Sequence, residues 1–279
     1  MENYIPLRKR RELGAILSDT FAFSRNNSKQ LFSVLVKTCG IPFIVVLVAS
    51  AYYQYVMLDP DPVSMASNIM IALLALALAG GIFYAMSAST IFSFTHEYEV
   101  NRGVVEESTV IDQAKSKFGS MVLLMIICYM MMAFGFIFFV IPGIYFIVPV
   151  VLAFPLMIFR EKSIGETISE SFRLTKGYWW VTFGTILVIS IIIGLISFAF
   201  SMPSLIYMLI KTVISASQSS IGSPEMPNDF IYMILATIGS AASYVLTVVM
   251  HIAIGFVYYD LDEEKNKTGI RQQIDELGS

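Results

Sequence analysis

The hydrophobic positions of this chain form long uninterrupted runs, and most polar positions fall in short segments between them. A helix needs about 20 apolar residues to cross the roughly 30 Å core of a bilayer. Runs that reach or approach this length cover residues 31–56, 68–94, 118–141, 144–159, 178–200 and 230–259. The pattern therefore predicts an all-α polytopic membrane protein with six transmembrane helices.

Proline and glycine punctuate these runs. Only VIPGI separates the third run from the fourth, which predicts a tight helical hairpin. Pro203 is predicted to end the fifth helix. Residues 204–218 are too short and too mixed to span, and are predicted to form a short helix on the outer surface.

Composition supports the membrane class. The chain is 56% hydrophobic and 14% charged, with a mean hydropathy of +0.72, whereas soluble domains carry about 25% charged residues. Cys39 and Cys128 both lie within apolar runs, which favours reduced packing residues over a disulfide. The N-terminal stretch lacks a short apolar core with a cleavage site, so no cleaved signal peptide is predicted.

Lysine and arginine are distributed on one side of the predicted topology. They precede the first run, lie between the second and third and between the fourth and fifth, and follow the sixth. The opposite loops hold Lys211 together with Asp59, Asp61, Glu225 and Asp229. The positive-inside rule then places both termini in the cytoplasm. We expect a single membrane domain over 1–279, with an interfacial helix in 1–30, a six-span bundle over 31–259 and a charged cytoplasmic tail over 260–279.

Two segments of the chain resemble each other. LGAILSDTFAFSR at 13–25 aligns without a gap to IGETISESFRLTK at 164–176, and both carry an apolar stripe spaced for a helix. The matched positions include Gly14 with Gly165, Ser18 with Ser169, and Phe21 with Phe172. A fainter echo pairs FGSMV at 118 with FGTIL at 183. The pattern predicts a unit of one interfacial helix and two spans, used three times. The alternative is that any apolar helix entering a membrane looks like this.

His251 is the main candidate for chemistry inside the bilayer, because a titratable group within a span is a functional candidate. It continues a stripe of small and polar residues made of Ala236, Ser240, Ser243, Thr247, His251 and Gly255. This face is expected to point into the bundle. A neutral histidine bonded to Thr247 or to a neighbouring helix is one interpretation, and a proton-linked switch is the other. The switch normally needs carboxylates, and the predicted spans hold none.

Two further groups are candidates for packing or binding. Ala77, Gly81, Ala85 and Ser89 form a small-residue ridge, suited to internal helix packing or to a partner subunit. Arg8, Lys9, Arg10 and Arg11 are suited to anionic lipid headgroups, at about 1 kcal/mol per charge, and also to setting orientation. Lys37 is placed to extend its amine toward the headgroups.

No catalytic, metal or cofactor motif is recognised in the sequence. Two histidines are too few for a histidine-based metal site, and HExxH, GxSxG and a phosphate-binding glycine loop are not found. We predict no catalytic or metal residues and no cofactor. The expected partners are the lipid bilayer and other membrane subunits, with no nucleic acid.

The segment IPGIYFIVPVVLAFPLMIFREKSIGETISESFRLTKGYWW at 141–180 resembles the membrane-domain family named after glycerophosphoryl diester phosphodiesterases. The matching residues are Pro142, Gly143, Tyr145, Pro155, Ser171, Lys176, Gly177 and Trp179. The end of the sixth run, FVYYDLDEEKNKTG, is similar to the family's terminal stretch. The resemblance implies an accessory membrane module in a bacterial inner membrane. It supplies no catalytic residues, because hydrolysis in fused members belongs to a separate soluble domain.

Two functional classes follow from these patterns. Uncharged spans, small-residue ridges and cytoplasmic surface helices favour a non-enzymatic scaffold or auxiliary subunit of a membrane assembly. The internal repeat, the proline and glycine within spans, and His251 favour a transporter or lipid-handling protein. Transporters of charged solutes usually keep charged residues at mid-membrane, so the scaffold is the preferred prediction.

Overall fold

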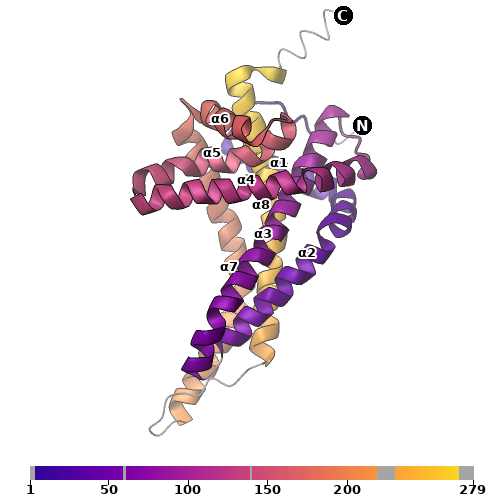
Figure 1. Cartoon of the computed structure of the whole chain (residues 1–279). Helices are drawn as coiled ribbons and strands as arrows, with labels where there is room; N and C mark the ends of the chain where they lie inside the picture. The colour runs from indigo at the N-terminus through magenta and orange to yellow at the C-terminus, as the bar shows by residue number, and fades with distance from the viewer. Residues whose placement is uncertain (1–3, 59–60, 139, 219–229, 270–279) are drawn as a thin grey trace, which may run out of the picture. The chain divides into compact units, whose positions relative to one another are not determined.

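The computed structural model describes residues 4–58, 61–138, 140–218 and 230–269, and helices cover nearly all of them (Figure 1). Two short helices are α1 (Leu13–Asn26) and α6 (Ile164–Thr175). Six helices are long and apolar enough to cross a membrane: α2 (Ser28–Met57), α3 (Pro62–Val100), α4 (Glu107–Phe138), α5 (Val140–Phe159), α7 (Trp179–Gln218) and α8 (Phe230–Asn266). The predicted all-α fold of a multi-pass membrane protein is confirmed.

Local chemistry explains where several helices begin. The Asp61 carboxylate accepts the backbone N–H groups of Val63 and Ser64, each at 3.2 Å, at the start of α3. At the start of α6, Glu166 accepts the Ser163 hydroxyl at 2.7 Å. Gly177, at φ 92°, makes the turn from α6 into α7, and this left-handed conformation favours glycine.

The structure corrects the prediction that Pro203 ends a helix. α7 continues through Pro203 as far as Gln218, so the short outer helix predicted over 204–218 is the last part of α7. Flanking hydroxyls bond to nearby carbonyls, from Ser204 to Ser201 at 2.8 Å and from Ser201 to Ser197 at 3.2 Å. Such local bonds help membrane helices to tolerate proline. Residues 219–229, which follow α7, lie outside the described residues.

The chain folds into two compact units. The first unit comprises Met1–Cys39, Ala85–Ile191 and Val248–Ser279, and the second comprises Gly40–Tyr84 and Ile192–Thr247. The helices α2, α3, α7 and α8 therefore each contribute one part to each unit, whereas α1, α4, α5 and α6 belong wholly to the first.

The second unit is a bundle of four helix segments held by aromatic and small side chains. The Tyr244 ring of α8 meets Phe83 of α3 edge-on at 5.4 Å, and its hydroxyl lies 3.1 Å from the Ser50 hydroxyl of α2. A Cβ added at Gly239 would lie 3.3 Å from the Cα of Ser201, so a small residue is needed where α8 approaches α7.

The first unit has an aromatic core under α1. Phe23 is fully buried and meets the rings of Phe94, Tyr98 and Phe256 edge-on, at 6.0, 4.8 and 5.9 Å.

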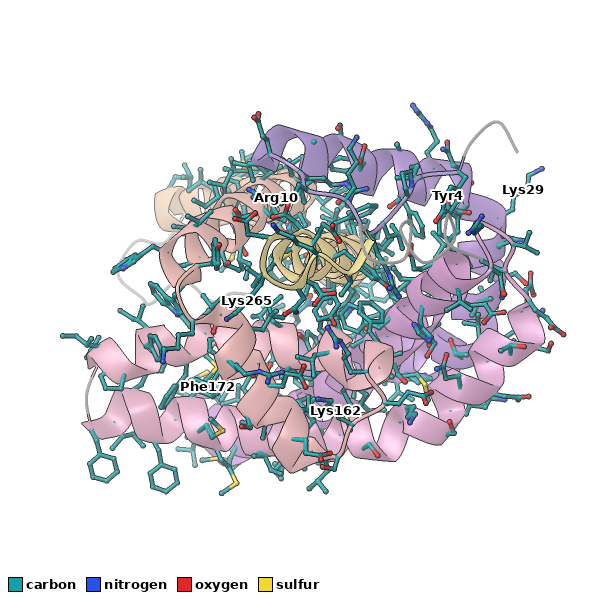
Figure 2. The ribbon with its side chains drawn as sticks, turned by 90° about the horizontal axis from the view of Figure 1, so that it is seen from above. Tyr4, Arg10, Lys29, Lys162, Phe172 and Lys265 are labelled. Atoms are coloured by element: carbon teal, nitrogen blue, oxygen red, sulfur yellow. The ribbon has the colours of Figure 1, made fainter. Side chains whose placement is uncertain are left out.

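In the same unit α4 and α5 lie side by side (Figure 2). A Cβ added at Gly135 would lie 2.9 Å from the Cα of Gly143, so the two helices touch closely beside their turn. This is the tight hairpin that the sequence predicts.

Candidate functional site

The strongest concentration of polar chemistry lies in the first unit, where the N-terminal segment meets the end of α3. The backbone N–H of Ile5 donates to the Tyr98 hydroxyl at 2.9 Å, and Arg8 pairs with Glu99 at 3.1 Å. Tyr4 stacks on Tyr98 at 5.4 Å between ring centroids. Burial, with the nearby Glu99 charge, raises the pKa of Tyr4 to about 12. These contacts fix the segment before α1 against α3.

Arg11 is the most buried cation of the N-terminal cluster, at 7% exposure. Its guanidinium donates to Asp19 at 2.8 Å and to the Leu7 carbonyl at 2.7 Å, and lies 4.9 Å from the centre of the Phe256 ring. Its backbone N–H donates to Asp260 at 2.7 Å. A buried guanidinium needs this many partners, because an unpaired charge would be costly to bury.

The predicted headgroup cluster is therefore used largely within the protein. Arg8 pairs with Glu99, Arg10 with Asp260 and Glu264, and Arg11 with Asp19. Lys9 is exposed, as is Arg10, and Lys9 is the member of the four that is left for lipid or solvent in this arrangement. The positions were found from the sequence, but three of the four cations have acidic partners that the sequence pattern did not indicate.

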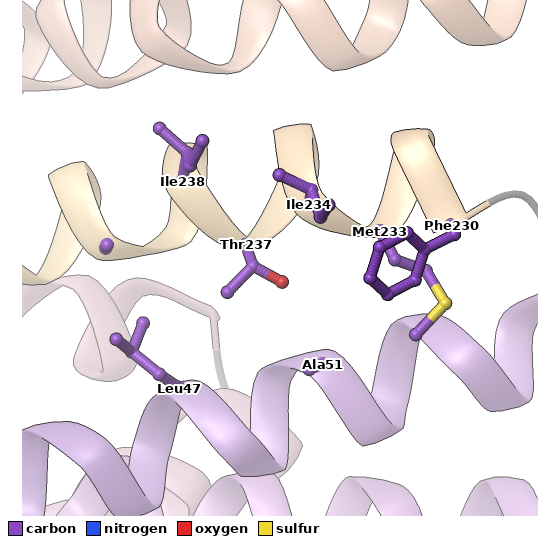
Figure 3. Close-up of a pocket in the computed structure, with 8 residues that line it drawn as sticks. Leu47, Ala51, Phe230, Met233, Ile234, Thr237 and Ile238 are labelled. Atoms are coloured by element: carbon purple, nitrogen blue, oxygen red, sulfur yellow. The ribbon is translucent and has the colours of Figure 1, made fainter.

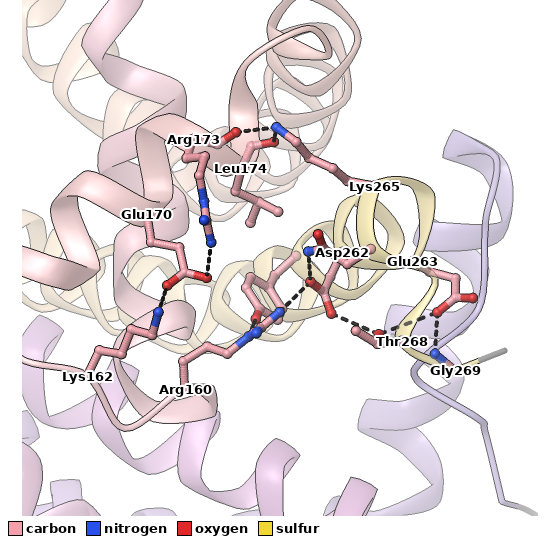
Figure 4. A network of polar contacts seen from close by, with 12 residues as sticks. Arg160, Lys162, Glu170, Arg173, Leu174, Asp262, Glu263, Lys265, Thr268 and Gly269 are labelled. Carbon is pink, nitrogen blue, oxygen red and sulfur yellow. Dashed lines mark hydrogen bonds and ion pairs between the residues drawn. The ribbon is translucent and has the colours of Figure 1, made fainter. Parts of the chain in front are cut away.

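A second part of the network joins the end of α5 to the end of α8 (Figure 4). Arg160 donates to Asp262 at 2.7 Å and to the Tyr258 hydroxyl at 3.1 Å. Burial would lower the pKa of Arg160, but Tyr258 and Asp262 outweigh it and raise the pKa. Asp262 also accepts the Thr268 hydroxyl at 2.9 Å, which holds the residues after α8 in place.

A third part holds α6 (Figure 4). Glu170 accepts Lys162 and, at 3.2 Å, Arg173. Lys265 of α8 donates to the Arg173 carbonyl and, at 3.1 Å, to the Lys176 carbonyl. A cation at the C-terminal end of a helix satisfies free carbonyls and opposes the helix dipole. α6 is thus fixed to α8 by charge rather than by apolar packing alone.

α1 and α6 are held in equivalent ways. Each of these helices has an acid that pairs with the cation eight residues before it, Asp19 with Arg11 and Glu170 with Lys162. The two pairs align under the offset that relates the two similar segments, 13–25 and 164–176. The same alignment matches three pairs of buried positions: Ile16 with Thr167, Thr20 with Ser171, and Phe23 with Leu174. The first residues of α2 and α7, Ser28 and Trp179, also correspond.

A polar cavity of about 170 Å³ lies within this network. Its walls include Arg8, His96, Phe159, Arg160, Tyr258, Tyr259, Asp262 and Thr268. The volume is below the roughly 300 Å³ of a typical small-molecule site. Two guanidiniums and a carboxylate at its walls suit water or a small anion.

His251 lies in the first unit, 1% exposed, between α8 and α3. Its Nδ1 atom is 3.5 Å from the Ser87 hydroxyl, and its ring meets Phe92 edge-on at 5.7 Å. Thr247 donates its own hydroxyl to the Ser243 carbonyl at 3.0 Å. The contact with Ser87 corresponds to the neighbouring-helix version of the packing interpretation.

The other candidate packing residues separate by unit. In the second unit the Ser243 and Ser197 hydroxyls pair between α8 and α7, and Ser240 donates to the Ala236 carbonyl at 3.0 Å. In the first unit a Cβ on Gly255 would lie 3.8 Å from Thr95. The small-residue ridge of α3 differs in exposure along its length. Ala85 and Ser89 are fully buried, Gly81 is half-buried and Ala77 is exposed.

An apolar groove runs between α2 and α8 in the second unit (Figure 3). Its volume is about 410 Å³, and it is lined by Leu47, Ala51, Phe230, Met233, Ile234, Thr237, Ile238 and Ala241. Branched and aromatic side chains give it a surface suited to an acyl chain.

The sequence pattern missed the acidic partners at the end of α8. The predicted charged cytoplasmic tail over 260–279 includes Asp260, Asp262, Glu263 and Glu264, yet Asp262 and Glu263 are each 5% exposed. Glu107 was missed too, and it pairs with Lys37 at 2.6 Å. The available signal for the α8 acids was their position directly after the aromatic residues Phe256, Tyr258 and Tyr259 on one helix. Within the described ranges, no three His, Cys, Asp or Glu side chains gather as a metal site requires.

Comparison of the chain with known protein families, with curated proteins and with solved structures found no match. The polar network, the cavity and the apolar groove are therefore the observations from which function is argued.

Proposed function

We propose that the protein is a non-enzymatic scaffold or auxiliary subunit of a membrane protein assembly in a bacterial inner membrane. The observation that carries the proposal is the polar network of the first unit. It joins the N-terminal segment, the ends of α3 and α8, and α6 through charges that are partnered inside the protein. Such a network gives a surface of fixed shape, which a docking platform needs.

The composition of the second unit supports the same proposal. Among its described residues the formally charged side chains are Asp61, at the start of α3, and Lys211, near the end of α7. Its serine hydroxyls bond to carbonyls or to other hydroxyls, as Ser50 does with Tyr244. A transporter of charged solutes is expected to carry ionised groups along its path.

We infer further that α1–α3 and α6–α8 are two copies of a duplicated unit. The equivalent ion pairs, buried positions and helix starts support this inference. Two unrelated helices of similar hydropathy would not be expected to share them. The resemblance of 141–180 to the phosphodiesterase membrane-domain family supports membership in that family of accessory modules. In this proposal both termini are cytoplasmic, as the lysine and arginine distribution predicts.

The test is purification of the native protein in mild detergent, followed by identification of what accompanies it through gel filtration. A stoichiometric membrane partner is expected. Ser169 is exposed on α6, so Ser169→Arg should remove the partner while the protein stays monodisperse. Ser67→Arg, at an exposed position near the start of α3, is the matched control and should retain it. A lone monomer from native membranes would contradict the proposal.

A lipid-handling protein is the second candidate, and the groove between α2 and α8 favours it. A bound lipid should then remain through native mass spectrometry. Ala51→Trp, which fills the groove wall, should remove that lipid without affecting a bound partner protein. The two candidates therefore give different masses in the same measurement.

A further inference from the structure

The start of α7 and the end of α8 lie at one level of the first unit. The Tyr178 hydroxyl, just before α7, donates to Glu264 at 3.1 Å, and Lys265 donates to the Lys176 carbonyl at 3.1 Å. Two helices that cross a membrane in opposite directions are expected to place these ends on the same face. This level therefore marks one surface of the bilayer.

The start of α5 lies at that surface. The Trp179 indole N–H donates to the Tyr145 carbonyl at 2.9 Å, and the two rings stack at 5.7 Å. Phe146 meets Phe172 of α6 edge-on at 5.7 Å. Tryptophan and tyrosine are enriched at the headgroup level, and Trp180 beside them is 78% exposed.

The end of α5 lies close to the same surface. Phe159, its last residue, stacks on Tyr259 of α8 at 4.8 Å, and the next residue, Arg160, pairs with Asp262 at 2.7 Å. Tyr259 and Asp262 precede the end of α8 by about two turns or less. A 20-residue helix is about 30 Å long, so a crossing α5 would have its two ends on opposite faces.

The figures agree with these contacts. In Figure 1, α4 and α5 run across the ends of α3 and α8 that belong to the first unit. In Figure 2 that end of α8 is seen along its axis, whereas α4 and α5 are seen lengthwise. α4 is bound to the same part of α3, since the Ser89 hydroxyl donates to the Ala114 carbonyl at 2.9 Å.

The turn between α4 and α5 is entirely apolar. No residue from 131 to 144 carries a polar side chain. Several side chains around the turn are largely exposed on the protein: Phe134 at 58%, Ile137 at 76%, Phe138 at 66%, Val140 at 63% and Ile141 at 81%. A turn that emerged into water on the far face would leave all of them hydrated, which is unfavourable.

We propose that the α4–α5 hairpin does not cross the bilayer but lies within one leaflet, on the face of the polar network. The partner of its exposed apolar surface is the acyl chains of that leaflet. Length and composition make both helices candidates for crossing, but the contacts at the two ends of α5 place both ends at one face. α2, α3, α7 and α8 then make the crossings, and the hairpin adds apolar volume to a single leaflet. This inference does not depend on the scaffold function.

Sided cysteine labelling tests the proposal on the full-length protein in intact cells. The background chain carries Cys39→Ser and Cys128→Ala. Ile141→Cys, at the turn, is compared with Val63→Cys, which is 77% exposed at the start of α3 on the opposite face. Lys9→Cys marks the network face. A charged, membrane-impermeant maleimide is added first to intact cells, then to inverted vesicles, and finally to detergent-solubilised protein.

Ile141→Cys should stay unlabelled from the face that labels Val63→Cys, and should react in detergent or from the Lys9→Cys face. Labelling of Ile141→Cys to the same extent as Val63→Cys, from the same face, would overturn the proposal. Val140→Cys serves as a second reporter of the turn and should behave as Ile141→Cys does. The recovery of each variant as a monodisperse species on gel filtration shows that it has folded.

Discussion

At the scale of single residues, Glu170 shows how charge holds a surface helix in place. Its side chain is 10% exposed and is shared by Lys162 and Arg173. Burial alone would raise the pKa of Glu170, but the hydrogen bond and charge of Lys162, with Arg160 and Arg173, lower it overall. The ionised carboxylate therefore stabilises the folded protein.

Glu170→Gln is expected to lower the free energy of unfolding at pH 7 by about 2 kcal/mol, the size of a charged hydrogen bond with little exposure. Because the folded pKa is depressed, the contribution is complete above the unfolded pKa of about 4.3 and is lost as the pH falls through the lower folded value. Thermal unfolding in detergent, followed by the fluorescence of Trp179 and Trp180, measures the difference. The difference between the wild type and the variant should shrink steadily as the pH falls below about 4.

Glu12→Gln is the matched control for this measurement. Glu12 is exposed and makes no side-chain capping bond at the start of α1. Its removal should leave the unfolding midpoint unchanged. If Glu170→Gln were as destabilising at pH 3 as at pH 7, the loss would come from packing rather than from the charge.

At the scale of elements, α1 offers two phenylalanines of opposite exposure. Phe23 is fully buried among Phe94, Tyr98 and Phe256, whereas Phe21 is 45% exposed. Phe23→Ala is expected to cost about 3 to 5 kcal/mol, because it removes a core ring and leaves a cavity. Phe21→Ala should cost less than about 1 kcal/mol. Equal losses in detergent unfolding would show that α1 is not packed through the Phe23 face.

The sequence predicted the elements well where periodicity was strong. The two similar segments at 13–25 and 164–176 are helices, and the six apolar runs correspond to the six long helices. The spacing of Leu13, Leu17 and Phe21 predicts an apolar stripe on α1, but the buried face carries Ile16, Thr20 and Phe23 instead. Hydropathy cannot distinguish a face that packs on protein from one that meets lipid. It also could not show that α7 continues past Pro203.

At the scale of the whole molecule, most contacts of the candidate site could not be predicted from the sequence. Arg11 binds Asp260 across 249 positions, and Lys265 binds Lys176 across 89. Such pairs are set by the fold, so neither partner has a local pattern that points to the other. The cations were conspicuous as an orientation signal, and that role does not reveal which of them are also partnered by acids.

The same cations give a prediction for the complete chain. A fluorescent protein that matures only in the cytoplasm should be bright when fused to either terminus and dark when inserted between α7 and α8. A periplasmic phosphatase reporter should give the reverse pattern. Bright fluorescence from the insertion would place the network face outside and contradict the orientation.

The distribution of cations also predicts how robust that orientation is. Lys9, Arg25 and Lys29 are exposed, so replacing all three by glutamine should leave the described ion pairs intact. Arg102, Lys162 and Lys265 are among the cations that remain on the same face, so the excess of lysine and arginine there is reduced but not removed. Because the signal is spread along the chain, the reporters should keep their pattern in this variant. A reversed pattern would mean that Lys9, Arg25 and Lys29 outweigh all the cations that remain along the chain.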